Sequence, residues 1–81
     1  MTTRTITVEY FAVLREHAGK ANEQLSTDAA TPADLYAELN DRYRFPNMQS
    51  LKVAINDDFS DMQAPLSDGD TVVFIPPVAG G

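Results

Sequence analysis

The residues with the clearest chemical potential stand at the end of the sequence, which reads Pro76-Pro77-Val78-Ala79-Gly80-Gly81. Because the last two residues have no side chains, we expect the terminal carboxylate to be the least hindered functional group of the chain. Six extended residues reach about 20 Å, and two prolines favour an extended conformation with little entropy left to lose. The sequence therefore predicts a flexible tail over residues 76–81 that offers Gly81 to another protein, with Gly80 permitting a close approach.

The rest of the sequence lacks the parts for catalysis by itself. It contains no Ser/His/Asp constellation and no phosphate-binding glycine loop. Cysteine is absent, which excludes disulfides, thiolate nucleophiles and zinc sites built on sulfur. His17 is the only histidine, so we expect a solvated side chain and no metal site. Asp57, Asp58 and Asp61 lack the spacing and the closing glutamate of a calcium loop, and we interpret them as part of a solvated turn.

The composition is that of one small globular domain over residues 1–81. The apolar fraction of 43% suits a single core. The net charge of −6 would repel phosphate backbones, so nucleic acid is not an expected partner. This acidity serves solubility, or steers the chain towards a basic face of a protein partner. No apolar run is long enough for a membrane span, and charged residues interrupt every candidate signal peptide, so we expect a cytoplasmic protein without membrane contact.

Strand and helix patterns follow one another along the chain. Residues Thr5–Phe11 alternate between apolar and polar and predict a strand, with Phe11 breaking the alternation. A short helical turn is expected over Ala12–His17, ended by Ala18-Gly19, and a weaker strand over Asn22–Thr27. These two strands would form a hairpin.

The strongest helix signal begins at Thr31. Its hydroxyl can cap the helix, Pro32 suits the first helical position and Asp34 the third. An apolar stripe every four residues follows this start, and Pro46 would end any continuation. The stripe consists of Leu35, Leu39 and Tyr43.

Three further segments complete the expected sheet. Leu51–Asn56 alternates as a strand, Asn56-Asp57-Asp58 indicates a turn with Phe59 just beyond it, and Asp68-Gly69-Asp70 indicates another turn before a last strand over Thr71–Ile75. The order predicts an α+β fold in which a mixed sheet packs one face onto one main helix, with the first and last strands parallel neighbours.

The strand patterns also predict which side chains face the core. Ile6, Val8 and Tyr10 would join Val72 and Phe74 against the helix. The opposite face would carry Phe11, Val73 and Ile75 outwards. Because monomers rarely leave a contiguous apolar patch exposed, this outward set predicts a docking surface beside the root of the tail.

The stretch Leu66–Gly81 resembles the C-terminal signature of the molybdopterin synthase small subunit, a family of β-grasp, ubiquitin-like sulfur carriers (MoaD type). Tyr10–Glu16 matches the family's aromatic-Phe-Ala-x-x-Arg-Glu pattern, and Val53–Asn56 fits its third-strand segment. Length and element order also agree, so the likeness covers essentially the whole chain, whereas Asn40–Gln49 carries no family pattern.

The resemblance implies a non-catalytic, sulfur-donating subunit. A carboxylate is ionised in the cell and is a poor electrophile. In the family an E1-like adenylyltransferase activates it with ATP and Mg²⁺, so that AMP is transiently linked to Gly81 and no cofactor is permanently bound. Sulfur from a donor protein then replaces AMP, and the resulting thiocarboxylate enters the large synthase subunit, expected here in a heterotetramer. There it attacks cyclic pyranopterin monophosphate, and two transfers build the molybdopterin dithiolene.

Site residues follow from that likeness. Gly81 would carry the adenylate and then the sulfur, with Gly80 beside it. The expected contacts to partner proteins are Phe11, Arg15, Phe59, Ile75, Pro76, Pro77 and Val78. Three alternatives stay open: a ubiquitin-like modifier joined to protein lysines, a carrier for thiamine or another sulfur metabolite, and a plain binding domain. The Pro-Pro pair and the Phe74-Ile75 pair favour the molybdopterin type over the thiamine type.

Overall fold

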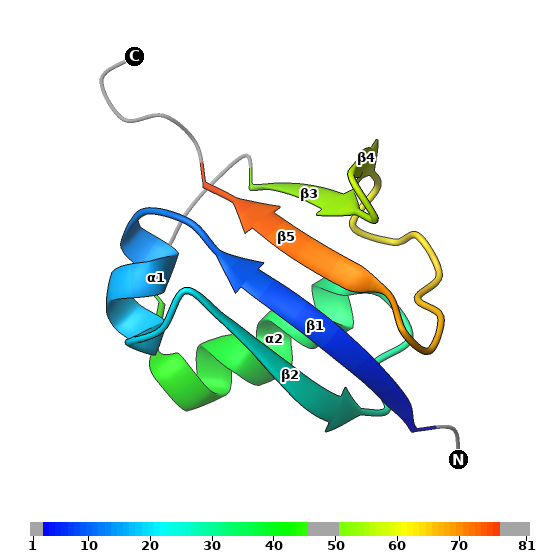
Figure 1. Cartoon of the computed structure of the whole chain (residues 1–81), viewed down its shortest axis with the longest axis horizontal. Coiled ribbons are helices and arrows are strands. Elements are labelled where there is room, and N and C mark those ends of the chain that lie inside the picture. The colour runs from blue at the N-terminus through cyan, green and yellow to red at the C-terminus, as the bar shows by residue number, and fades with distance from the viewer. Residues whose placement is uncertain (1–2, 46–50, 77–81) are drawn as a thin grey trace.

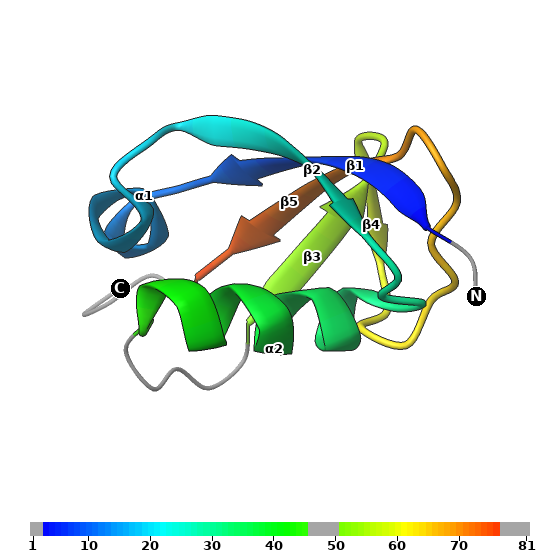
Figure 2. The same ribbon diagram turned by 90° about the horizontal axis from the view of Figure 1, so that it is seen from below.

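The computed structural model describes residues 3–45 and 51–76, which form one mixed β-sheet with a long helix against one face (Figures 1 and 2). Within these residues the elements are β1 (Arg4–Tyr10), α1 (Val13–Ala18), β2 (Asn22–Thr27), α2 (Pro32–Tyr43), β3 (Lys52–Ile55), β4 (Asp58–Ser60) and β5 (Thr71–Ile75). The strands lie side by side in the order β2-β1-β5-β3-β4. The predicted α+β architecture, with one main helix on a mixed sheet, is confirmed.

The first and last strands occupy the middle of the sheet. β1 and β5 pair in parallel, with Val8 opposite Val72 and Tyr10 opposite Phe74, as predicted. All four side chains are buried, together with Ile6, so the expected core is confirmed. Because parallel strands run in one direction, β1 and β5 end at the same edge of the sheet (Figure 1).

Helix α2 closes this core from below, as Figure 2 shows. Its start matches the prediction, because the Thr31 hydroxyl accepts a hydrogen bond from the Asp34 N–H at 3.2 Å. The helix ends after Tyr43, where Arg44 adopts a left-handed conformation (φ 57°) that commonly closes helices. Pro46, the predicted stop, lies outside the described residues. No helix within the described ranges is both long and apolar enough to cross a bilayer.

Several element boundaries differ from expectation by one residue. The predicted strands Thr5–Phe11 and Leu51–Asn56 are Arg4–Tyr10 and Lys52–Ile55, and the predicted helical turn Ala12–His17 is Val13–Ala18. β1 ends at Tyr10, because the next residue, Phe11, begins the turn into α1. Asp58 belongs to β4, because Asn56 and Asp57 alone make the hairpin turn between β3 and β4. Both have positive φ (53° and 73°), the conformation of a two-residue type I′ turn.

The carboxylates of the turn before β5 hold backbone in place. Asp68 accepts a hydrogen bond from the Thr5 N–H at 2.6 Å, and Asp70 accepts from the Ser67 N–H at 2.8 Å and from the Asn56 amide at 2.9 Å. Gly69 between them has φ 91°, as the predicted turn requires. Among residues 3–45 and 51–76, no group of three metal-binding side chains is assembled.

Candidate functional site

The site is organised around the end of β5, from which the predicted tail departs. Ile75 and Pro76 are both half-buried at the edge where β1 also ends. The roles predicted for the other tail residues stay predictions. These residues lie outside the described part of the chain: Pro77, Val78, Gly80 and Gly81. The surroundings of Pro76 therefore define what a partner meets at the root of the tail.

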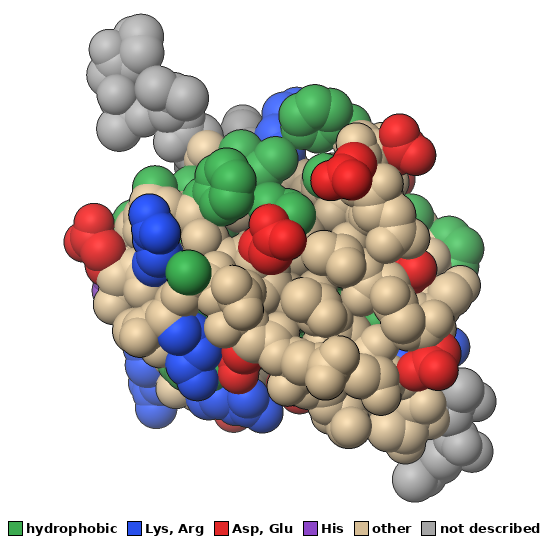
Figure 3. All heavy atoms as spheres, viewed as in Figure 1, with side chains coloured by type: hydrophobic (Ala, Val, Ile, Leu, Met, Phe, Trp, Pro, Cys, Tyr) green, Lys and Arg blue, Asp and Glu red, His purple; other side chains and the backbone are tan. Residues whose placement is uncertain are grey.

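The sheet face that α2 leaves uncovered carries an apolar surface, seen in Figure 3 over β3, β4 and β5. Val73 pairs with Ala54, and Ala54 pairs with Phe59, so the three side chains form a row across these strands. Phe59 is 78% exposed and Phe11 is 49% exposed. We name Phe11, Ala54, Phe59, Val73 and Ile75 the open-face patch. Phe11, Val73 and Ile75 lie on this face as predicted, and their docking role stays a prediction.

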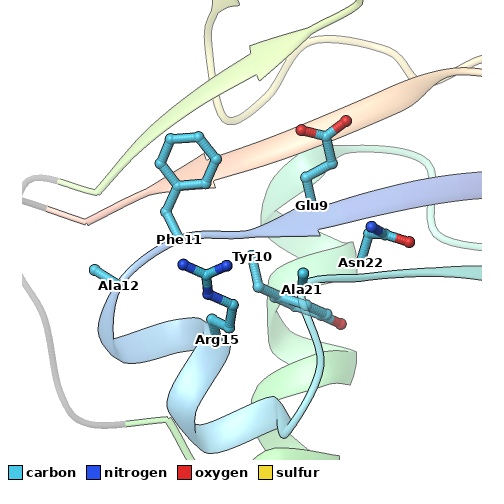
Figure 4. Close-up of a pocket in the computed structure, with 7 residues that line it drawn as sticks. All are labelled: Glu9, Tyr10, Phe11, Ala12, Arg15, Ala21 and Asn22. Carbon is cyan, nitrogen blue, oxygen red and sulfur yellow. The ribbon is translucent and has the colours of Figure 1, made fainter.

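A shallow pocket of about 280 Å³ adjoins the patch where β1 turns into α1 (Figure 4). The Arg15 side chain reaches from α1 back towards β1. Within the described residues no hydrogen bond or ion pair engages its guanidinium, so its donors are available to a partner carboxylate. The lining residues are Glu9, Tyr10, Phe11, Ala12, Arg15, Ala21 and Asn22. The structure thus brings the predicted contacts Phe11 and Arg15 together at one pocket.

A strained turn fixes the relative positions of Phe11 and Arg15. Ala12 has φ 53° and ψ −124°, and the Leu14 N–H donates to the Phe11 carbonyl at 3.0 Å. These values describe a type II′ turn with alanine where glycine is preferred. Such a conformation costs about 1–3 kcal/mol and persists only where the surrounding structure enforces it. Nothing in the sequence indicated this strain, because alanine is not a turn signal.

A second feature that sequence reasoning missed is a carboxylate shared by two tyrosines. Glu23 of β2 accepts hydrogen bonds from the Tyr10 hydroxyl at 2.5 Å and from the Tyr43 hydroxyl at 2.6 Å. Lys20 and Arg42 lie 3.6 and 4.0 Å from its other oxygen. We define these five residues as the Glu23 cluster, which joins β1, β2 and the end of α2. Because Tyr10 also lines the pocket, the cluster stabilises that side of it.

The electrostatics of the Glu23 cluster follow from this geometry. Burial raises the pKa of Glu23, but the hydrogen bonds from Tyr10 and Tyr43 and the charges of Lys20 and Arg42 together lower it by more, so the net pKa lies below its usual value. Burial and the hydrogen bond to Glu23 raise the pKa of Tyr10. The cluster therefore holds an ionised carboxylate and a neutral tyrosine at neutral pH.

Comparison with known proteins agrees with this fold. The molybdopterin synthase sulfur carrier subunit of Escherichia coli (strain K12) is 35% identical over 80 residues, covering 94% of this chain and 99% of the relative. The small archaeal modifier protein 1 of Methanosarcina acetivorans superposes with a TM-score of 0.80, 25% identity and 100% coverage of both chains. A chain in the complex of molybdopterin-converting factor subunits 1 and 2 from Helicobacter pylori 26695 gives a TM-score of 0.59 and 27% identity, covering 95% of this chain and 99% of that one.

These likenesses confirm the predicted β-grasp, ubiquitin-like fold, because the same mixed sheet and helix recur in the matched structures. The model of the ThiS family matches residues 8–81, which include the end of β1, the open-face patch and the whole predicted tail. The chain therefore belongs to the ThiS family and is a ubiquitin-like sulfur carrier of the ThiS/MoaD type.

Proposed function

We propose that this chain is the sulfur carrier subunit of a molybdopterin synthase. The observation that carries the proposal is the 35% identity to the E. coli sulfur carrier subunit, which extends over nearly the full length of both chains. Gly81 would first be adenylated by an E1-like enzyme and would then become a thiocarboxylate. Its sulfur would pass to cyclic pyranopterin monophosphate in the large synthase subunit.

The position of the tail root beside an exposed apolar face supports this proposal. β5 lies between β1 and β3, hydrogen-bonded on both sides, so the root of the tail leaves from an interior strand of the sheet. The open-face patch and Arg15 flank that root and offer apolar area and hydrogen-bond donors to a docking protein. A rigid body with a docking face would thus deliver the terminal group into a partner's active site.

The intact mass of the protein purified from its own cells tests the function. We expect a fraction of molecules whose mass is higher by the exchange of one oxygen for one sulfur, located at Gly81 by fragmentation. Incubation of that fraction with the large subunit and cyclic pyranopterin monophosphate should return the ordinary mass and form the dithiolene. Sulfur at Gly81 that passes only to a thiazole precursor would instead support the thiamine alternative.

Protein modification is the second candidate, favoured by the superposition with an archaeal modifier protein at a TM-score of 0.80. Activation of the terminal carboxylate is common to both functions, and only the acceptor differs. In that case the same cells would contain ladders of higher-mass conjugates that carry Gly81 on lysines of other proteins. Ladders without any thiocarboxylate would contradict the sulfur-carrier proposal.

The docking face gives a separate prediction. A Phe59→Asp variant should bind the large subunit at least about 30-fold more weakly, because loss of an exposed aromatic anchor at an interface costs about 2 kcal/mol or more. Phe59 is 78% exposed on a short edge strand, so the fold should survive the change. Titration calorimetry with the purified subunits measures the effect.

Gln24→Asp is the matched control for this measurement. Gln24 is exposed on β2, the opposite edge strand of the sheet, and the substitution adds the same charge far from the open-face patch. It should leave the affinity unchanged. If the Phe59 variant and the unaltered chain bind the large subunit with equal affinity, Phe59 does not contribute to the docking surface.

A further inference from the structure

The two lysines of the chain lie in opposite environments. Lys20 precedes β2, and Lys52 opens β3. A carrier whose terminal carboxylate is activated meets nucleophiles other than sulfur, and a lysine amine is the most common of them in proteins. A lysine can react only where neighbouring groups do not engage its amine and where the C-terminus of a chain can reach it.

Lys20 is engaged by its neighbours. Its Nζ lies 3.6 Å from the Glu23 carboxylate and 5.6 Å from the centre of the Tyr43 ring. The Tyr43 hydroxyl and the Glu23 charge raise its pKa, so the amine keeps its proton more firmly than an ordinary lysine. A protonated amine has no lone pair with which to attack a carbonyl group.

Lys52 is exposed, and within residues 3–45 and 51–76 no hydrogen bond or ion pair engages its side chain. It pairs with Ile75 across β3 and β5, one residue before Pro76. Because Val53 is buried in the core, the alternation of the strand directs Lys52 to the open face. Figure 1 shows that β3 begins beside the end of β5. The Lys52 amine therefore stands at the root of the tail, next to the open-face patch.

We propose that Lys52 is an acyl-acceptor site that captures the activated Gly81 of a second copy of this chain. This inference rests on the proposed activation of Gly81. The Lys52 nitrogen attacks the Gly81 carbonyl carbon, a C–N isopeptide bond forms, the bond to the leaving group breaks, and the amine proton passes to solvent. AMP leaves when the donor is the adenylate, and a thiol leaves when it is a thioester.

A second copy is favoured over the chain's own tail. The Pro-Pro pair at 76–77 favours an extended conformation, at about 3.1 Å per residue, so we expect the tail to lead away from its root. An attack by Lys52 on Gly81 of the same molecule would then require residues 78–81 to turn back completely towards the root of the tail. In a second copy no such reversal is needed.

Capture at Lys52 would have a consequence for docking. Because Lys52 lies beside Ile75, a covalently attached second copy would stand over the open-face patch of the acceptor. Each copy has one donor end and one acceptor amine, so repeated reaction gives head-to-tail chains, which close into rings only where the geometry brings the two ends together. Self-conjugation and docking of a partner on this face would then exclude one another.

The test uses the full chain with a Gly81 thioester of 2-mercaptoethanesulfonate, prepared by intein cleavage, incubated at high protein concentration in mildly alkaline buffer. We expect a covalent dimer whose branched peptide joins Gly81 to Lys52, identified by tandem mass spectrometry. Lys52→Arg should lower the dimer yield by at least about tenfold, because the guanidinium stays protonated. Lys20→Arg, the matched control, should form dimer at the unaltered rate, and circular dichroism checks that both variants fold.

Several results would overturn the proposal: a branch at Lys20 or at the amino terminus, an undiminished yield from the Lys52 variant, or no dimer at all. A main product that is monomeric and lighter by one water than the free acid would assign the reaction to the same molecule and overturn the second-copy part. The thioester is installed chemically, so a failure here is distinct from an absence of sulfur at Gly81 in cells.

Discussion

A Gly81→Leu variant purified from its own cells is expected to fold normally and to carry no detectable thiocarboxylate. In the proposed function, the terminal carboxylate must come within bonding distance of a nucleotide phosphate, and a branched side chain on the adjacent Cα obstructs that approach. Misplacement of a reacting group by about 1 Å already costs about 100-fold in rate. Intact-mass analysis measures the sulfur-loaded fraction directly, and Gly80→Leu should show the same loss.

Ala37→Leu provides the control for added bulk. Ala37 is exposed on α2, which covers the face of the sheet opposite the open-face patch, and the variant should load sulfur like the unaltered chain. Normal loading of the Gly81 variant would refute the threading of the tail into a partner's active site.

The second large effect concerns the Glu23 cluster. Glu23→Gln should lower the free energy of unfolding at pH 7 by about 2–3 kcal/mol, because hydrogen bonds to a charged acceptor contribute that much. The Tyr10 and Tyr43 hydroxyls lie 2.5 and 2.6 Å from the same oxygen of the Glu23 carboxylate, and both would lose this shared acceptor. Urea unfolding followed by circular dichroism gives the value.

The pH dependence of this effect has a definite sign. The pKa of Glu23 is lower in the folded chain than in the unfolded chain, where it is about 4.3. Its contribution is therefore complete above the unfolded pKa and is lost as the pH falls through the folded pKa. The gap in stability between the Gln variant and the unaltered chain should narrow over that acidic range, because a protonated Glu23 resembles glutamine.

Tyr43→Phe tests whether the hydroxyls carry the effect. When Tyr43→Phe is already present, Glu23→Gln should cost less than in the unaltered chain, and the difference is the coupling energy of this pair. A gap that stays constant from pH 7 down to the acid limit would show that the carboxylate charge is not the stabilising feature.

Local patterns allowed most of the fold to be predicted from the sequence. The strand Asn22–Thr27 and the start of α2 at Thr31 agree with the structure, because alternation and capping are determined by neighbouring residues. The parallel pairing of β1 and β5 followed from the order of the elements and the limited ways a sheet can connect.

The parts that could not be predicted depend on distant residues or on backbone strain. Glu23 meets Tyr10 across 13 positions and Tyr43 across 20, and no local pattern encodes such a meeting. Ala12 and Arg44 adopt positive φ without being glycine or asparagine, so their side chains give no signal of it. The pocket beside Arg15 likewise depends on the turn that Ala12 makes.

The position of β5 has a consequence for synthesis on the ribosome. Residues 71–75 supply the strand between β1 and β3, so neither neighbour has its full set of pairing partners until these late residues emerge. Chains grow from the amino terminus, and a product that stops before Phe74 lacks a central side chain of the core. Abortive translation products would therefore be unfolded and open to proteases, and would not accumulate as truncated chains that lack the terminal Gly-Gly pair.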